Sequence, residues 1–208
     1  MFQNTLLGCI DCSVLKQIVY YDKGRWIMTK EIGFIIGSLR KDSYNRKVAE
    51  NIVELLPEGF EASFIEIGDL PLYNEEYDDG TLETPESYTR FRNELANTDA
   101  FIFVTPEYNR AMPASIKNAI DVGSRPYEEM KWAGKKVAVI SASLSMTAGV
   151  RANYEVRTSL AFLGANVLAQ PEVMLSEIHK CFDENGNMIE FTREFLASFV
   201  EKFVEFIK

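Results

Sequence analysis

The fold is decided by two stretches of this sequence, GSLRKDSYN at residues 37–45 and TPEYNRAMPASIKNAID at residues 105–121. Each follows an apolar run that predicts a buried strand, and each leads into a pattern that predicts a helix. The carboxyl ends of parallel strands in an open α/β sheet form the crevice where ligands bind. We therefore expect the two stretches to face one site.

The first stretch has the chemistry of a phosphate-binding loop. Ser43 is a good N-cap for the helical spacing that follows, and a helix beginning there points unpaired N–H groups and the positive end of its dipole at the crevice. Ser38, Arg40 and Asn45 add side-chain donors. Because the dinucleotide fingerprint and the P-loop pattern are both absent, a monophosphate fits better. The alternative is an ordinary connection whose serines only cap the helix.

The second stretch suits the edge of a planar ring. Pro106 fixes one backbone dihedral and restricts the residue before it. Backbone groups of Glu107, Tyr108 and Asn109 would then line a heterocycle, with Tyr108 as an aromatic wall. Pro113 suits the start of the next helix. The alternative is a turn shaped by proline with Tyr108 packed in the core.

In combination, GSxRxxSxN after one strand and TPEYNxxxPxxxKNAID after another resemble the NADPH-dependent FMN reductase family, which includes quinone, azo-dye and chromate reductases. The similarity runs from about residue 29 to the end of the chain. It implies a flavodoxin-like, doubly wound α/β fold with a five-stranded parallel sheet in the order 2-1-3-4-5 and helices on both faces. Residues 29–208 would form the FMN-binding reductase domain, and residues 1–28 an N-terminal extension that need not belong to the fold.

The resemblance also implies which residues hold the flavin. The first stretch would receive the FMN phosphate, and the second would receive the isoalloxazine ring. A third loop at residues 141–151 follows a predicted strand and aligns with the last flavin-side loop of the family. The implied cofactor-binding residues are Ser38, Leu39, Arg40, Ser43, Tyr44, Asn45, Pro106, Glu107, Tyr108, Asn109, Ser141 and Ser143.

This third loop departs from the family pattern at two positions. Members usually carry two adjacent glycines where this chain has Ala148 and Gly149, and Ser145 replaces an earlier glycine. Residues other than glycine restrict the backbone, so both departures bear on how closely a nicotinamide or an acceptor approaches.

Strand-like and helix-like runs alternate along the chain, which predicts βαβ units and a parallel sheet covered on both faces. Predicted strands are residues 31–36, 61–67, 99–104, 136–141 and 165–169, and predicted helices are residues 44–56, 85–97, 113–122, 149–163 and 191–207. A chain of 208 residues with 47% hydrophobic composition can bury roughly 70% of its unfolded surface in one core.

Charge and hydropathy exclude several classes of partner. A net charge of -9 without a basic block argues against a nucleic-acid surface, and no run approaches the ~20 apolar residues of a membrane span. The apolar stretch before Cys9 is too short for a signal peptide, so we expect a cytoplasmic protein.

Three minor motifs carry no expected chemistry. Cys9 and Cys12 have a CxxC spacing, but the pair precedes the first core strand and has no second pair, which favours two free thiols. His179 is expected in a surface loop, with no metal role. Residues 183–187 resemble a calcium loop, yet their glycine is misplaced for an EF-hand and a turn is expected.

We therefore expect an FMN-dependent NAD(P)H oxidoreductase with a ping-pong cycle, in which NADPH or NADH reduces the flavin and a quinone, azo compound, free flavin or metal oxyanion then oxidises it. No side chain is expected to act as a catalytic residue. The alternatives are a flavodoxin-type electron carrier and a nonenzymatic flavin-sensing module. A homodimer or homotetramer is expected, with Tyr127 and Trp132 in the region of self-association; alternatively, both pack under the following loop.

Overall fold

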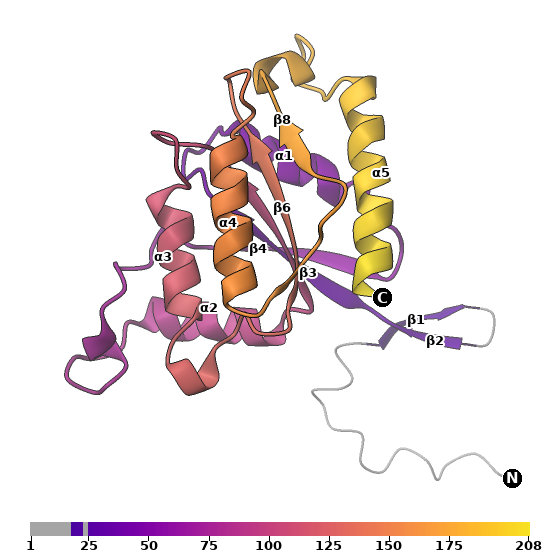
Figure 1. Ribbon diagram of the computed structural model, residues 1–208. Helices are drawn as coiled ribbons and strands as arrows, with labels where there is room; N and C mark the ends of the chain where they lie inside the picture. The colour runs from indigo at the N-terminus through magenta and orange to yellow at the C-terminus, as the bar shows by residue number, and fades with distance from the viewer. Residues whose placement is uncertain (1–17, 23–24) are drawn as a thin grey trace, which may run out of the picture.

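The computed structural model describes residues 18–22 and 25–208 and contains a parallel sheet with helices on both faces (Figure 1). The strands run in the spatial order β4-β3-β5-β6-β7, which is the predicted 2-1-3-4-5 order, and β8 pairs with the other half of β6. They are β3 (Lys30–Ile36), β4 (Phe60–Ile65), β5 (Ala100–Thr105), β6 (Lys136–Ala142), β7 (Asn166–Val167) and β8 (Val173–Leu175).

The predicted fifth strand at residues 165–169 is present but shorter, as β7, and a sixth strand, β8, follows it that the sequence did not predict. Pro171 in the gap has no N–H to offer a ladder. Side chains of the neighbouring helix bond the carbonyls on either side instead: Arg157 donates to Leu168 O at 2.7 Å and Asn153 to Val173 O at 3.4 Å. Burial lowers the pKa of Arg157 from its ordinary value.

Two helices cover one face of the sheet and three cover the other, in agreement with the predicted alternation. On the first face lie α1 (Tyr44–Val53) and α5 (Glu190–Ile207), and on the second lie α2 (Glu86–Asn97), α3 (Ala114–Gly123) and α4 (Val150–Phe162). Helix α1 ends before the predicted residue 56. Its end is tightened by bonds from Leu55 N to Ile52 O and from Leu56 N to Val53 O.

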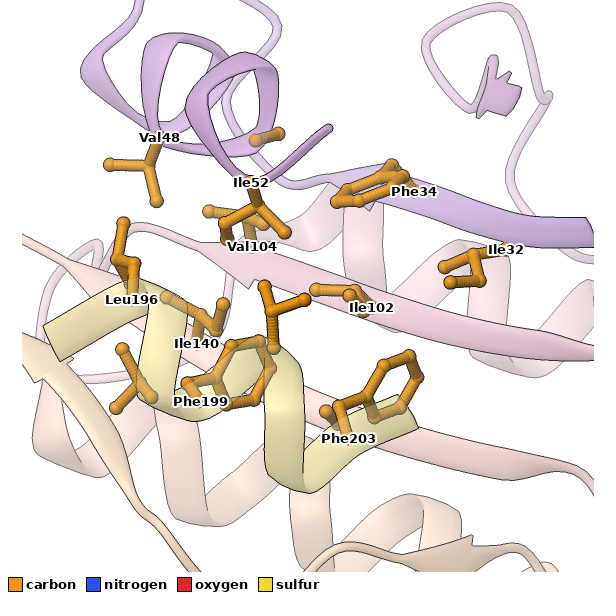
Figure 2. Close-up of a cluster of buried hydrophobic side chains, with 14 of the residues drawn as sticks. Ile32, Phe34, Val48, Ile52, Ile102, Val104, Ile140, Leu196, Phe199 and Phe203 are labelled. Carbon is orange, nitrogen blue, oxygen red and sulfur yellow. The ribbon is translucent and has the colours of Figure 1, made fainter. Parts of the chain in front are cut away.

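The core on the first face forms where the apolar stripe of a helix packs on the apolar residues that alternate along the strands. Phe199 and Phe203 of α5 lie over alternate residues of the central strands such as Ile102 and Ile140 (Figure 2). Each fully buried side chain of this size contributes roughly 1.5–3 kcal/mol. The result is a rigid platform whose strand ends carry the three loops singled out from the sequence.

Aromatic packing on the second face corrects one expectation. Trp132 is fully buried, donates from Nε1 to Ile120 O at 2.9 Å and packs edge-on against Phe101. It is therefore a core residue and cannot serve in an interface between copies. Tyr127, in the 3-10 turn η3 (Tyr127–Glu129), is exposed.

Residues 18–22 and 25–28 form a separate two-stranded sheet. Strands β1 (Ile18–Asp22) and β2 (Arg25–Met28) pair antiparallel, and this hairpin is not hydrogen-bonded to the main sheet (Figure 1). Cys9 and Cys12 lie outside the described residues. The division into an extension and a reductase domain remains a prediction.

The remaining motifs lie on the surface as expected. His179 is exposed in the 3-10 turn η4 (Ile178–Cys181). A further 3-10 turn, η2 (Glu75–Tyr77), lies in the loop between β4 and α2. Asp183 accepts hydrogen bonds from the N–H groups of Asn185 and Asn187, which closes the predicted turn. Within the described residues there is no group of three side chains suited to a metal ion. None of the helices described is both long and apolar enough to cross a membrane.

Candidate functional site

A cleft of about 430 Å³, here called the main cleft, opens at the carboxyl ends of β3, β5 and β6. The loops that follow these three strands converge on it, as the sequence predicts for an open α/β sheet. Nine of the predicted site residues line it together: Ser38, Arg40, Ser43, Tyr44, Asn45, Pro106, Glu107, Tyr108 and Ser143.

The loop after β3 has backbone N–H groups that find no partner within the described chain. For the N–H groups of residues 38–45, the described part of the chain offers no acceptor within hydrogen-bonding distance. Ser43 caps α1 as predicted, since its Oγ accepts from Arg46 N at 3.1 Å. With Arg40 at the rim, this donor set fits a phosphate monoester.

Packing holds this first loop close to the second. A Cβ on Gly37 would lie 2.6 Å from Ile116 Cδ1 and 2.9 Å from Pro106 Cδ, so only glycine fits there. Ser115 Oγ, in the first turn of α3, donates to Gly37 O at 2.8 Å. On the other side, Asn45 is buried and donates from Nδ2 to Ala142 O at 3.4 Å, which ties the first loop to the third.

The second loop is a tight two-residue hairpin. Tyr108 and Ala111 exchange both backbone hydrogen bonds at 3.0 Å. Between them Asn109 and Arg110 have φ values of 53° and 69°, the backbone of a type I′ turn. Arg110 is unusual in such a conformation, which costs a non-glycine residue of the order of 1 kcal/mol. This turn leaves Tyr108 50% exposed at the cleft, not in the core.

Glu107 joins the second loop to the third. Its side chain is only 7% exposed, and Oε2 accepts from Arg151 N at 3.0 Å and from Ala152 N at 3.4 Å. These two N–H groups belong to the first turn of α4, where they have no partner within the helix. The N-cap residue Gly149 has no side chain that could cap them. The carboxylate thus acts as the missing cap, supplied from another loop.

The third loop is held by its own side chains. Ser141 is fully buried and donates to Ala148 O at 2.7 Å. Ser143 Oγ accepts from Ser145 N at 3.1 Å. Ala148 and Gly149 have positive φ values of 54° and 72°. Ala148 therefore has a left-handed backbone conformation that favours glycine, at a position where the sequence comparison expected glycine.

Three predicted site residues do not line the main cleft. Leu39 is exposed beside it, Asn109 lies in the hairpin turn, and Ser141 is covered by the third loop. Four lining residues were not among the predicted site residues. Ala142, Leu144 and Ser145 belong to the third loop, which the sequence had placed on the flavin side, whereas Ile178 had no sequence signal.

Comparison with known proteins decides the family. A profile of the family described as NADPH-dependent FMN reductase matches residues 31–180, more than half of the chain. This chain belongs to that family. A quinone reductase of Pseudomonas putida is 46% identical over 177 residues, which cover 85% of this chain and 94% of that protein. A 2-hydroxy-1,4-benzoquinone reductase of Burkholderia sp is 36% identical, covering 87% of this chain and 98% of that protein.

A solved structure agrees with the sequence relatives. The flavoenzyme NAD(P)H:(acceptor) oxidoreductase FerB from Paracoccus denitrificans has a TM-score of 0.79 and 35% identity, covering 86% of this chain and 97% of that one. The protein is therefore an oxidoreductase whose cofactor is FMN and whose electron donor is NAD(P)H. The N–H groups of the first loop, which have no acceptor in the described chain, suit the phosphate of that cofactor.

Proposed function

We propose that this protein reduces quinone-type acceptors with electrons from NAD(P)H, using FMN bound in the main cleft. The observation that carries the proposal is the convergence of three strand-end loops on one cleft, where residues 38–45 present N–H groups that the described chain leaves without acceptors. The high similarity to proteins named quinone reductases favours quinones among the possible acceptors.

Each loop has a separate task in this proposal. Residues 38–45 and the guanidinium of Arg40 bind the phosphate. Pro106 and the hairpin behind it set the position of the ring, with Tyr108 as an exposed aromatic wall. Ser143, Leu144 and Ser145 line the third side of the cleft and restrict which molecules reach the ring.

FMN supplies the hydride chemistry when bound, so this chain needs no side-chain nucleophile or general acid of its own. Its residues bind, orient and partly enclose the cofactor. The cleft remains open to solvent beside Tyr108 and Leu144, both exposed, and donor and acceptor would use this opening in turn. This is a ping-pong cycle, and azo compounds, free flavin and metal oxyanions are further acceptors to test. A cytoplasmic location and a homodimer or homotetramer belong to the same proposal.

The test uses the full chain loaded with FMN. Anaerobic addition of NADPH should bleach the yellow flavin spectrum, and addition of 1,4-benzoquinone should restore it within the turnover time. Initial rates at several fixed quinone concentrations should give parallel double-reciprocal lines. A flavin that stays yellow with both NADPH and NADH would contradict the proposal and favour the electron carrier or the sensing module.

A further inference from the structure

Two buried side chains of α4 are tied to the wall that the third loop forms in the main cleft. Asn153 and Arg157 lie one turn apart on this helix, so both extend from the same face. Asn153 is fully buried and Arg157 is half-buried. Arg157 donates from Nε to Asn153 Oδ1 at 2.7 Å, which joins the two side chains into one unit. We call them the α4 pair.

One end of the α4 pair reaches the base of the third loop. Asn153 Nδ2 lies 3.3 Å from Val139 O and 3.3 Å from Ser141 Oγ, in the half of β6 that leads into the loop. Ser141 extends this chain of bonds, because its hydroxyl donates to Ala148 O at 2.7 Å near the end of the loop. The pair is therefore connected to both ends of the third loop.

The other end of the α4 pair spans the gap between β7 and β8. Arg157 donates from Nη1 to Leu168 O at 2.7 Å, directly after β7, and Asn153 Nδ2 lies 3.4 Å from the carbonyl oxygen of Val173, the first residue of β8. Figure 1 shows α4 beside β6 and β8. The pair thus supplements the ladder between these two strands, which joins only three residues of each.

Strand β8 leads into a second part of the cleft wall. Ser143 N donates to Leu175 O at 3.1 Å, and Ser143 O accepts from Ile178 N at 2.9 Å. Ser143 and Ile178 both line the main cleft. A shift of β8 or of Ser141 would therefore move this wall relative to Tyr108 in the second loop.

The bonds of Arg157 are directed at neutral oxygens. Its partners are the amide oxygen of Asn153 and two main-chain carbonyls, Leu168 O at 2.7 Å and Val139 O at 3.5 Å. The planar guanidinium carries its donors in a fixed fork and can hold all three oxygens at once, whereas a lysine ammonium has no such fork. These contacts fix the geometry of the segments that they join.

We propose that Arg157, acting through Asn153, is a positioning residue for the reaction. The α4 pair sets where Ser143 and Ile178 lie, and thereby how the electron donor and the acceptor approach the flavin. Neither residue of the pair lines the main cleft, and a displacement of about 1 Å caused far from the chemistry is enough to change a rate strongly. The inference rests on the proposed function, because donor and acceptor use the opening beside this wall.

The first test compares Arg157→Met with the wild type in the presence of excess FMN. Methionine is also long and unbranched but cannot donate a hydrogen bond. KM for NADPH and KM for 1,4-benzoquinone should each rise about fivefold while kcat stays within about twofold, because binding of both reactants is weakened and the flavin chemistry is not. Arg157→Lys keeps the charge without the fork and should raise both constants about twofold. It serves as the test variant if Arg157→Met does not fold.

Lys135→Met is the matched control. Lys135 is also half-buried, burial lowers its pKa as it does that of Arg157, and its Nζ donates to Ala96 O at 3.2 Å and Thr98 O at 2.6 Å. It directly precedes β6 and so lies at the end of that strand opposite to the third loop. This variant should lose stability and keep both KM values. Wild-type KM values in the folded Arg157 variants, or equal rises in Lys135→Met, would overturn the proposal.

A double-mutant cycle tests the connection through Asn153. Asn153→Ala should raise both KM values about as much as Arg157→Met does. The double variant should add less than about a further twofold, because both substitutions break the same chain of bonds. Effects that multiply in full would mean that Arg157 acts by another route, and would contradict the inference.

Hydrogen exchange separates this inference from the proposed function. In the FMN-loaded protein, the amides of residues 142–148 should exchange about fivefold faster in Arg157→Met and Asn153→Ala than in the wild type, and no faster in Lys135→Met. If neither NADPH nor NADH reduces the flavin, the proposed function fails, and the exchange rates still decide whether the α4 pair positions the third loop. Unchanged exchange in these residues would overturn the inference in an enzyme that turns over normally.

Discussion

The first loop differs from the second and third loops in where its polar groups find partners. Backbone N–H groups of residues 38–45 have no acceptor in the described chain. In the other two loops several polar groups bond one another: Glu107 binds the start of α4, Tyr108 pairs with Ala111, and Ser141 with Ala148.

This difference separates two tasks that the sequence alone merged into one list of site residues. Donors without a partner in the chain pair with water or with a ligand, so in the proposed function the first loop is free to bind the phosphate. Donors already satisfied within the chain fix geometry. Substitutions in the first loop should therefore weaken binding more than folding, and those in the other loops should affect both.

The largest effect is expected for Glu107→Ala. Loss of the buried carboxylate removes the acceptor for two N–H groups at the start of α4 and should lower the free energy of unfolding by about 2–3 kcal/mol. Because the second and third loops then separate, FMN and riboflavin should both bind more weakly. Urea denaturation and fluorescence titration with the two flavins measure these losses.

Glu155→Ala is the control for that prediction. Glu155 also links α4 to the second loop, accepting from Met112 N at 2.7 Å, but it is exposed and bonds a single N–H. It should cost about 1 kcal/mol or less. A stable Glu107→Ala protein that loses only FMN affinity would mean that Glu107 acts as a ligand, and the comparison of the loops would fail.

Arg40→Ala should produce the opposite pattern. Arg40 is exposed and its only recorded partner in the described chain is Asp42 O at 3.1 Å, so the free energy of unfolding should hardly change. FMN binding should weaken by about 1–3 kcal/mol, with riboflavin affected much less because it lacks the phosphate. Lys41→Ala, beside it but outside the main cleft, should retain FMN. An equal loss of both flavins in Arg40→Ala would place the phosphate elsewhere.

Much of the fold could be predicted because its elements are decided locally. Ser43 as an N-cap and the apolar run before Gly37 place one strand-to-helix turn, and the same logic places the others within a few residues. The sixth strand, β8, was not predicted. It is flanked by side-chain contacts from α4, in which Arg157 bonds Leu168 O and Asn153 bonds Val173 O, and no local sequence pattern encodes such contacts.

The site was predictable as a set of loops but not in its internal bonding. The sequence placed Glu107 at the flavin ring because it follows Pro106. In the structure its carboxylate bonds the start of α4, which begins at Val150, 43 residues after Glu107. Trp132 resembled an interface residue because aromatic residues suit both interfaces and cores. Its full burial, the bond from Nε1 to Ile120 O and the packing against Phe101 distinguish the two.

Ser43→Ala tests a residue that lines the main cleft and also bonds within the chain. Ser43 lies in the first loop, yet its Oγ already accepts from Arg46 N. Removing the cap should lower the free energy of unfolding by about 1 kcal/mol and weaken FMN binding by a similar amount. Ser43→Thr keeps a capping hydroxyl and should restore most of the stability. Loss of FMN binding with unchanged urea midpoint would show that the hydroxyl serves the ligand alone.

The smallest effect, and one of opposite sign, is expected for Ala148→Gly. Ala148 has a φ of 54°, where a Cβ costs about 1 kcal/mol, and glycine relieves this while it adds freedom to the unfolded chain. The net gain in the free energy of unfolding should be about 0.5 kcal/mol. Ala152→Gly, four residues later within α4, should instead lose about 1 kcal/mol. If both substitutions destabilise equally, the left-handed backbone of the third loop is not an intrinsic strain. FMN affinity should stay the same in Ala148→Gly, because this loop is held by Ser141 and Glu107 rather than by the ligand.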